Sequence, residues 1–350
     1  MANLTETAYY TRRTVNWLII GFFAYLFLRV LWALGVTFWL IVFPPKPPPP
    51  NHAFNKLPAL QFPKQASPSG DLVFRLETIE GAVPKGPDTA LVYFMPKQPA
   101  NLLALTKTQD FATRLSLNAT PIQESKNIYR FEDEEVPLRR LRYDIVSNNF
   151  ILRYLFEQDT GLFADRILPS ADATISEAKS LLQTYNLYVD DLAQGTSKNT
   201  YLKLRGDTLI PTTSLSQSDA IRVDFFRKDI EKIPVYTPFP DEGPVSIIFS
   251  GAVQSKKRIL QFAYTFWPID YETKGTYPLK PSTLAWQELQ AGKGYIARFP
   301  TTGKMALVRT VKIGYYDSFD PETYLQPIYV FEGDFDFLGF VPAVSPEWVE

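Results

Sequence analysis

The residue pair with catalytic spacing is Ser176 and Lys179, which reproduces the Ser-x-x-Lys arrangement of penicillin-interacting enzymes. In such a site the serine is the nucleophile, and Ser197–Asn199 would be the second motif. The sequence has no Lys-Thr-Gly or similar third motif on a later expected strand, and Thr174–Glu177 has the spacing of a capping box that opens a helix. We therefore predict no catalytic residue, and we place a hydrolase third among the functional hypotheses.

Carboxylates suited to acid–base work or to a divalent cation gather at two places. One is the acidic block Glu132–Glu135, which is followed by Arg139, Arg140 and Arg142. The other is Asp334–Asp336, which lacks the spacing of an EF-hand. Both chemistries need a cleft and a fixed separation of the carboxylates, which adjacent residues in a turn seldom provide. We interpret both places as turns and predict no metal ligand.

The remaining reactive residue types are scarce. The 350-residue chain has no cysteine and a single histidine, His52, so disulfides, thiolate catalysis and zinc ribbons are excluded. We expect no cofactor. The net charge of -1 provides no basic field, which argues against nucleic-acid binding. A large exported domain without disulfides fits a bacterial envelope.

Residues 17–43 form an apolar run that contains one charge, Arg29, and no proline. As a helix this run is roughly 40 Å long, whereas the hydrocarbon core of a bilayer is about 30 Å thick. It is longer than the apolar region of a cleaved signal peptide and has no small-residue cleavage site. We predict a single transmembrane signal anchor, with the lipid bilayer as its surroundings.

Positive charges predict the orientation of this anchor. Arg12 and Arg13 precede the span closely, whereas Lys46 follows it. By the positive-inside rule, residues 1–16 are a cytoplasmic tail and the rest of the chain after the span is extracytoplasmic.

Arg29 lies far from both ends of the apolar run, so it is expected near the middle of the membrane. An arginine there costs roughly 2.5–3.5 kcal/mol on insertion scales. One hypothesis is that Arg29 contacts a polar group on another transmembrane helix. The alternative, which has equal weight, is that its side chain snorkels and the apolar residues offset its cost.

Residues 44–70 follow the span as a proline-rich linker. Pro44–Pro50 is expected to form polyproline II, a stiff spacer of roughly 20 Å at about 3.1 Å per residue.

The rest of the chain predicts an α+β fold of antiparallel sheets with packed helices. A helical stripe at 101–115 is followed by a meander of strands at 128–131, 141–146 and 150–156. A second helix at 174–185 is followed by strands again, and a third is expected at 283–291. The repeated order raises the hypothesis of two related modules, a first at 71–165 and a second at 166–350.

Aromatic residues are dense toward the end of the chain. Exposed tyrosines and tryptophans can form a groove for glycans or peptides. The candidates for such binding are Tyr264, Trp267, Tyr271, Trp286, Tyr316 and Tyr324. Their alternation along expected strands favours half-buried sheet faces over a groove, and both interpretations stay open.

The stretches Val311–Tyr316 and Tyr324–Phe331 resemble the closing strands of the YycH/YycI family. The region Asn127–Phe156, with its YDIVSNNFIL strand pair, is similar in layout to the PepSY-like modules of that family. Members are membrane-anchored envelope proteins that regulate a two-component sensor kinase. The resemblance therefore implies PepSY-like modules and a regulatory role.

These observations lead to a non-enzymatic, membrane-anchored protein that binds and modulates a membrane sensor or another envelope protein. The alternative is a cell-wall or glycan-binding protein that uses the aromatic residues. The sequence does not specify the oligomeric state.

Overall fold

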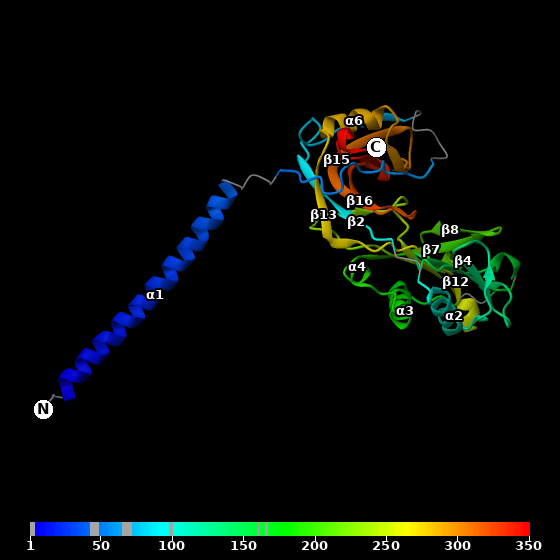
Figure 1. Ribbon diagram of the computed structural model, residues 1–350, viewed down its shortest axis with the longest axis horizontal. Helices are drawn as coiled ribbons and strands as arrows, with labels where there is room; N and C mark the ends of the chain where they lie inside the picture. Colours follow the sequence, from blue (N-terminus) through cyan, green and yellow to red (C-terminus); the bar gives the residue numbers. More distant parts are fainter. Residues whose placement is uncertain (1–3, 43–48, 65–71, 98–100, 160, 165–166) are drawn as a thin grey trace. The chain divides into compact units, whose positions relative to one another are not determined.

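The computed structural model describes residues 4–42, 49–64, 72–97, 101–159, 161–164 and 167–350 (Figure 1). The chain forms two compact units, Met1–Pro49 and Pro50–Glu350. Residues 49–64 of the predicted linker at 44–70 are described, and there Leu57 is buried and pairs with Val349, so this part packs on the folded domain instead of forming a free linker. Most of the expected polyproline II segment, Pro44–Pro50, lies outside the described residues.

The first unit is a single helix, α1 (Leu4–Val42), that runs through the predicted span. Within it, Tyr9–Trp39 is long and apolar enough to cross a membrane, with a mean hydropathy of 2.1 in its most apolar window. The Thr14 and Thr37 hydroxyls donate to carbonyls four residues earlier, both at 2.8 Å. These hydroxyls therefore keep a hydrogen-bond partner on an apolar helix.

The helix begins earlier than the apolar run. Most of the predicted tail at 1–16 is helical from Leu4 onward, because neither proline nor glycine occurs between Leu4 and Trp17.

The second unit is α+β, as predicted, and contains two sheets. The eight-stranded sheet consists of β1 (Val73–Leu76), β2 (Thr89–Phe94), β10 (Val235–Tyr236), β13 (Asp270–Pro278), β14 (Tyr295–Arg298), β15 (Met305–Tyr316), β16 (Tyr324–Gly333) and β17 (Leu338–Pro342). Its centre is the long antiparallel hairpin of β15 and β16, and β1 and β10 both pair with β15 in parallel. Helix α6 (Ser282–Gln290) packs beside β17.

The nine-stranded sheet is antiparallel throughout and has the order β3-β4-β5-β6-β12-β11-β9-β7-β8. Its strands are β3 (Ile122–Gln123), β4 (Ile128–Glu132), β5 (Arg139–Asp144), β6 (Phe150–Tyr154), β7 (Ser197–Arg205), β8 (Thr208–Thr212), β9 (Ala220–Phe225), β11 (Val245–Ser250) and β12 (Ile259–Tyr264). The remaining helices are α2 (Ala104–Arg114), α3 (Ala171–Thr184), α4 (Asp190–Ala193) and α5 (Ser255–Arg258), with 3₁₀ turns at Phe156–Gln158, Leu215–Gln217, Asp334–Asp336 and Pro346–Trp348.

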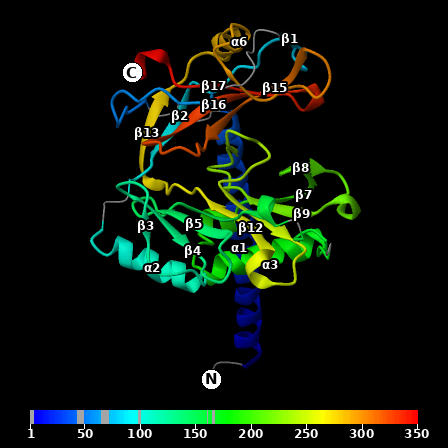
Figure 2. The same ribbon diagram turned by 90° about the vertical axis from the view of Figure 1, so that its right-hand side faces the viewer.

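The alternation of buried and exposed side chains along the strands shows which face of the nine-stranded sheet is covered by helices. In β5, Leu141 and Tyr143 are buried and Arg142 between them is exposed. The buried residues pack with α2 and α3, which lie on one side of this sheet (Figures 1 and 2). Phe150 is central to this core, with ring centroids of Phe111 and Phe262 at 5.0 Å and 4.9 Å.

The chain passes between the two sheets after β2, β9, β10 and β12. As a result, strands from both predicted modules belong to the nine-stranded sheet, β4 to β6 from residues 71–165 and β7 to β9 from residues 166–350. The boundary itself falls at residues 165 and 166, which lie outside the described residues. The strand pairing therefore divides the domain by sheet rather than at this position.

Helix α3 starts at a different cap from the one expected. Its N-cap is Ser170, whose hydroxyl accepts from the Ala173 N–H at 3.3 Å. The carboxylate of Glu177 instead accepts from Arg258 at 2.7 Å through both oxygens. The prediction of a capping box at Thr174–Glu177 is therefore wrong, because the helix begins one turn earlier and Thr174 lies inside it, where its hydroxyl donates to the Ser170 carbonyl at 2.9 Å.

The cations of α5 fix the turn between β11 and β12. Besides the Arg258 pair, Lys256 bonds Asp133 at 2.9 Å and Lys257 bonds Asp159 at 2.7 Å. Three consecutive side chains thus reach three different segments. Because Asp133 lies within the acidic block, that block is partly structural rather than solvated.

We predict that Phe150→Ala lowers the free energy of unfolding by about 3–5 kcal/mol, because the cavity left among its aromatic neighbours cannot close fully. Val253→Ala is the control, since Val253 is 84% exposed and its change should stay within about 0.5 kcal/mol. Urea unfolding followed by tryptophan fluorescence measures both. Equal effects of the two substitutions would contradict the assignment of this core.

Candidate functional site

The segments that cross between the sheets surround a cavity of about 600 Å³. Gln194, Thr196 and Lys198 line it from the end of α4 and the start of β7. Val235 and Tyr236 line it from β10, so both sheets contribute to its walls. A second cavity of about 320 Å³ shares Gln194, Lys228 and Asp229 with the first and continues to Tyr93, Tyr271 and Lys274. We refer to the two adjoining cavities as the inter-sheet groove.

Arg227 lies beneath this groove, in the crossing that follows β9. Its side chain is 1% exposed. Nε donates to Asp317 Oδ2 at 2.9 Å, Nη1 donates to Asp191 Oδ2 at 2.9 Å, and the ring centroid of Phe266 lies 4.0 Å away. Asp317 follows β15 of the eight-stranded sheet, whereas Asp191 lies on α4 beside the nine-stranded sheet. A single buried guanidinium therefore joins the two sheets.

The partners of Arg227 determine its charge state. Burial lowers the pKa of Arg227, but the carboxylates of Asp317 and Asp191 together outweigh this and raise it above its ordinary value. Tyr271 donates its hydroxyl to the same Asp191 oxygen at 2.8 Å. Burial, together with this hydrogen bond, raises the pKa of Tyr271. The cluster therefore consists of a charged arginine and a neutral tyrosine around two carboxylates.

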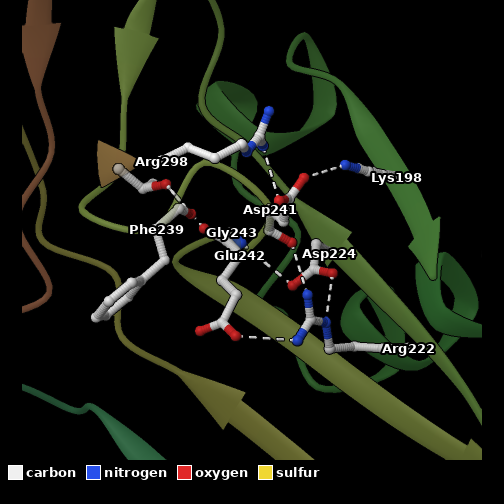
Figure 3. A network of polar contacts seen from close by, with 9 residues as sticks. Lys198, Arg222, Asp224, Phe239, Asp241, Glu242, Gly243 and Arg298 are labelled. Carbon is white, nitrogen blue, oxygen red and sulfur yellow. Dashed lines mark hydrogen bonds and ion pairs between the residues drawn. The ribbon is translucent and has the colours of Figure 1, made fainter. Parts of the chain in front are cut away.

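A second polar network holds the segment 237–243, which makes up all but the last residue of the connection from β10 to β11 (Figure 3). Asp224 on β9 is fully buried and accepts from Arg222 Nε at 2.8 Å and from the Gly243 N–H at 3.2 Å. Arg222 also donates to the Asp241 carbonyl at 2.7 Å and to Glu242 at 3.1 Å. We name residues 237–243 the junction loop.

The side chain of Asp241 connects the junction loop to both sheets (Figure 3). It pairs with Lys198 on β7 of the nine-stranded sheet and with Arg298 on β14 of the eight-stranded sheet, the latter at 2.7 Å. Burial raises the pKa of Asp241, but the Lys198 hydrogen bond and the Arg298 charge bring it below its ordinary value. Asp241 therefore remains ionised and keeps both pairs at neutral pH.

The predicted binding aromatics lie in separate core clusters. Tyr264, Trp286 and Tyr316 are 7%, 9% and 1% exposed and belong to three different clusters. Trp267 and Tyr271 pack against a fourth, and Tyr324 packs against a fifth. Tyr271 borders the inter-sheet groove. The six residues do not share one surface groove, because each of the strands and loops that carry them, and helix α6 that carries Trp286, buries its own inward side.

The other predicted candidates are also placed. Arg29 lies within the apolar run of α1 and is exposed there. Lys179 and Ser176 lie on α3, whereas Lys198 is in β7 and pairs with Asp241. Asp334 pairs with Arg309 at 2.7 Å. Among the described residues, no group of three or more histidine, cysteine, aspartate or glutamate side chains has the arrangement of a metal site.

Sequence reasoning missed the residues that organise the groove. Asp224 breaks the apolar pattern of the AIRVDF strand, and Arg227 follows that strand closely. A charge within a strand that is otherwise buried signals a buried partner. The partner of Arg227, Asp317, lies 90 positions away, so spacing along the chain did not reveal the pair.

No protein-family model and no curated protein matches the chain. Among solved structures, the crystal structure of an uncharacterized protein from Eubacterium rectale is similar over 74% of this chain and 84% of that chain. The sequence identity is 14% and the TM-score is 0.39. The functional argument therefore comes from the geometry of this chain.

We predict that Arg227→Met lowers the free energy of unfolding by about 3–5 kcal/mol, because it leaves Asp191 and Asp317 buried without their cation. Lys228→Met is the matched control: its ammonium lies 3.7 Å from Asp191 and is partly exposed, so the loss should be below about 1 kcal/mol. Chemical denaturation measures both. A small loss for Arg227→Met would show that the sheets are joined by other contacts.

Proposed function

We propose that this chain is a non-enzymatic, membrane-anchored regulatory protein whose extracytoplasmic domain binds a segment of a membrane or envelope partner in the inter-sheet groove. The observation that carries the proposal is that one groove is walled by both sheets of a domain that follows a helix able to span a membrane. A ligand there contacts two parts of the domain at once.

The groove offers the chemistry of a recognition site. Its walls combine an amide (Gln194), ammonium groups (Lys198 and Lys228), a carboxylate (Asp229) and an aromatic ring (Tyr236). Such a mixture of donors, acceptors and apolar surface suits a polar peptide segment better than a purely apolar molecule. The two cavities, about 600 and 320 Å³, provide room for several side chains.

The position of the groove supports a regulatory role. A ligand that fits one relative arrangement of the two sheets better than another shifts the population toward that arrangement. Because both sheets belong to the unit tethered by α1, a partner that occupies the groove also becomes localised at the membrane.

The orientation and the family resemblance add to the proposal. Arg12 and Arg13 favour a cytoplasmic N-terminus, which leaves Pro50–Glu350 outside the cytoplasm. The stretches that resemble the YycH/YycI family form the β15 and β16 hairpin, in which Val311 pairs with Phe331. A membrane sensor is therefore the first class of partner to test.

We predict that Thr196→Trp, which fills the groove, reduces crosslinking of the full-length protein to its membrane partner at least several-fold. Thr196 is an exposed wall residue, so the fold should be kept. Thr208→Trp is the control, since Thr208 is another exposed threonine, on β8. Quantitative mass spectrometry of crosslinked membranes measures the change. Unchanged crosslinking by the Thr196→Trp protein, or equal loss in both proteins, would overturn the groove as the binding site.

We predict that Arg29→Leu reduces the same crosslinking, because it removes the polar contact that Arg29 is proposed to make within the membrane. Arg29→Lys keeps the charge and should retain most of the signal. An anchor-swapped protein with an unrelated transmembrane helix should behave like Arg29→Leu. If all three variants recover the partner as well as the unchanged protein does, α1 is only a tether and Arg29 snorkels.

A further inference from the structure

We propose that the junction loop is a proton-responsive latch, which closes more tightly against β9 and β7, beside the inter-sheet groove, as the pH falls. This inference deepens the proposed function: the role of the latch as a gate rests on ligand binding in the groove, whereas the latch itself rests on the geometry of Asp224. The two are tested separately below.

The junction loop makes the contacts that a latch over the groove requires. Thr237 and Pro240 line the groove, so the loop forms part of its wall. Asp241 reaches Lys198 on one sheet and Arg298 on the other. When the loop lifts, it opens the wall of the groove and breaks both of these ion pairs.

Asp224 is the group beneath the latch. Its carboxylate is fully buried and accepts the Gly243 N–H at 3.2 Å, so the closed loop covers it. A side chain at Gly243 would meet the Phe225 carbonyl at 2.3 Å, which shows how closely the loop backbone lies on β9. Because of this close contact, lifting the loop exposes Asp224 to water.

The groups that face Asp224 come from each element packed against it. Arg222 on β9 donates to it at 2.8 Å, and Lys198 occupies the paired position on β7. Ser246 occupies the paired position on β11 and carries no charge. From the junction loop, Glu242 opposes ionisation of Asp224. Arg222, the cation bonded directly to Asp224, therefore favours the ionised carboxylate, whereas burial and the carboxylate of Glu242 favour the protonated form.

Burial raises the pKa of Asp224 to about 6, since it outweighs the attraction of Arg222. With the loop lifted and the carboxylate in water, the pKa returns to its ordinary value near 3.8. The closed state thus binds the proton more tightly than the open state. Lowering the pH through 6 favours closure, and raising it favours opening, by about tenfold in the closed-to-open ratio between pH 8 and pH 5.

The test is hydrogen exchange of the full-length protein in lipid nanodiscs, followed by mass spectrometry of the peptide that covers 237–243. Exchange is corrected for the intrinsic rate at each pH. We expect the protection of this peptide to rise about tenfold from pH 8 to pH 5. Protection that is flat with pH, or that falls on acidification, overturns the latch.

Two variants separate the effect of protonating Asp224 from the effect of the ion pairs of Asp241. Asp224→Asn cannot titrate, so its protection should not depend on pH. Asp241→Asn loses the Lys198 and Arg298 pairs but keeps Asp224, so protection should be lower at every pH while its rise on acidification remains. If Asp224→Asn keeps the rise on acidification, another group carries the effect and the latch is overturned. If the Asp224→Asn protein fails to fold, the pH dependence of protection in the wild-type and Asp241→Asn proteins still tests the latch.

The outcomes are distinct from those of the proposed function. If the exchange profile is as expected but Thr196→Trp binds its partner normally, the latch stands and the groove is not the binding site. If Thr196→Trp loses binding but the profile is flat, the groove stands and the latch is overturned.

Discussion

The folded domain depends on a buried positive charge. Arg227 is removed from water between two sheets and is neutralised by carboxylates on opposite sides, Asp191 near the nine-stranded sheet and Asp317 after β15. Burying a charge without partners is costly, so the arginine and both carboxylates are in place only when the sheets are correctly docked. Hydrophobic contacts stabilise each sheet with its helices, but they tolerate small shifts. The ion cluster permits one relative arrangement of the two sheets, and we infer that it determines how they dock.

The docking of the two sheets also creates the inter-sheet groove. The chain passes from sheet to sheet at several points, and three of these crossings, at 226–234, 237–244 and 265–269, meet near Arg227. Crossing segments cannot continue a strand ladder, so their backbone and side chains leave space between the sheets that neither sheet fills. The groove is therefore a consequence of topology, and its position beside a fixed ion cluster gives it a defined shape.

Stability is distributed unevenly around this centre. The Arg227 cluster is buried and fully partnered, whereas the junction loop is held by polar contacts: the ion pairs of the half-exposed Asp241, the hydrogen bond to Asp224, and the bonds that Arg222 and Tyr295 donate to it. Elements held by few buried contacts are those that open most readily in native proteins. In the proposed regulatory role, the rigid cluster keeps the sheets docked while the loop adjusts access to the groove.

The sequence alone determined the apolar span, the α+β class and most strand and helix positions, because these depend on local periodicity and composition. It places Asp224 and Arg227 as charges in an apolar context, but it does not reveal which residues neutralise them. Tertiary structure decided that Asp317 meets Arg227, that Glu177 bonds Arg258 instead of capping its helix, and that the late aromatics fill separate cores. It also decided that strands from both halves of the chain share one sheet. The physical reason is that partners far apart in sequence are chosen by the packing of whole sheets, which local patterns do not encode.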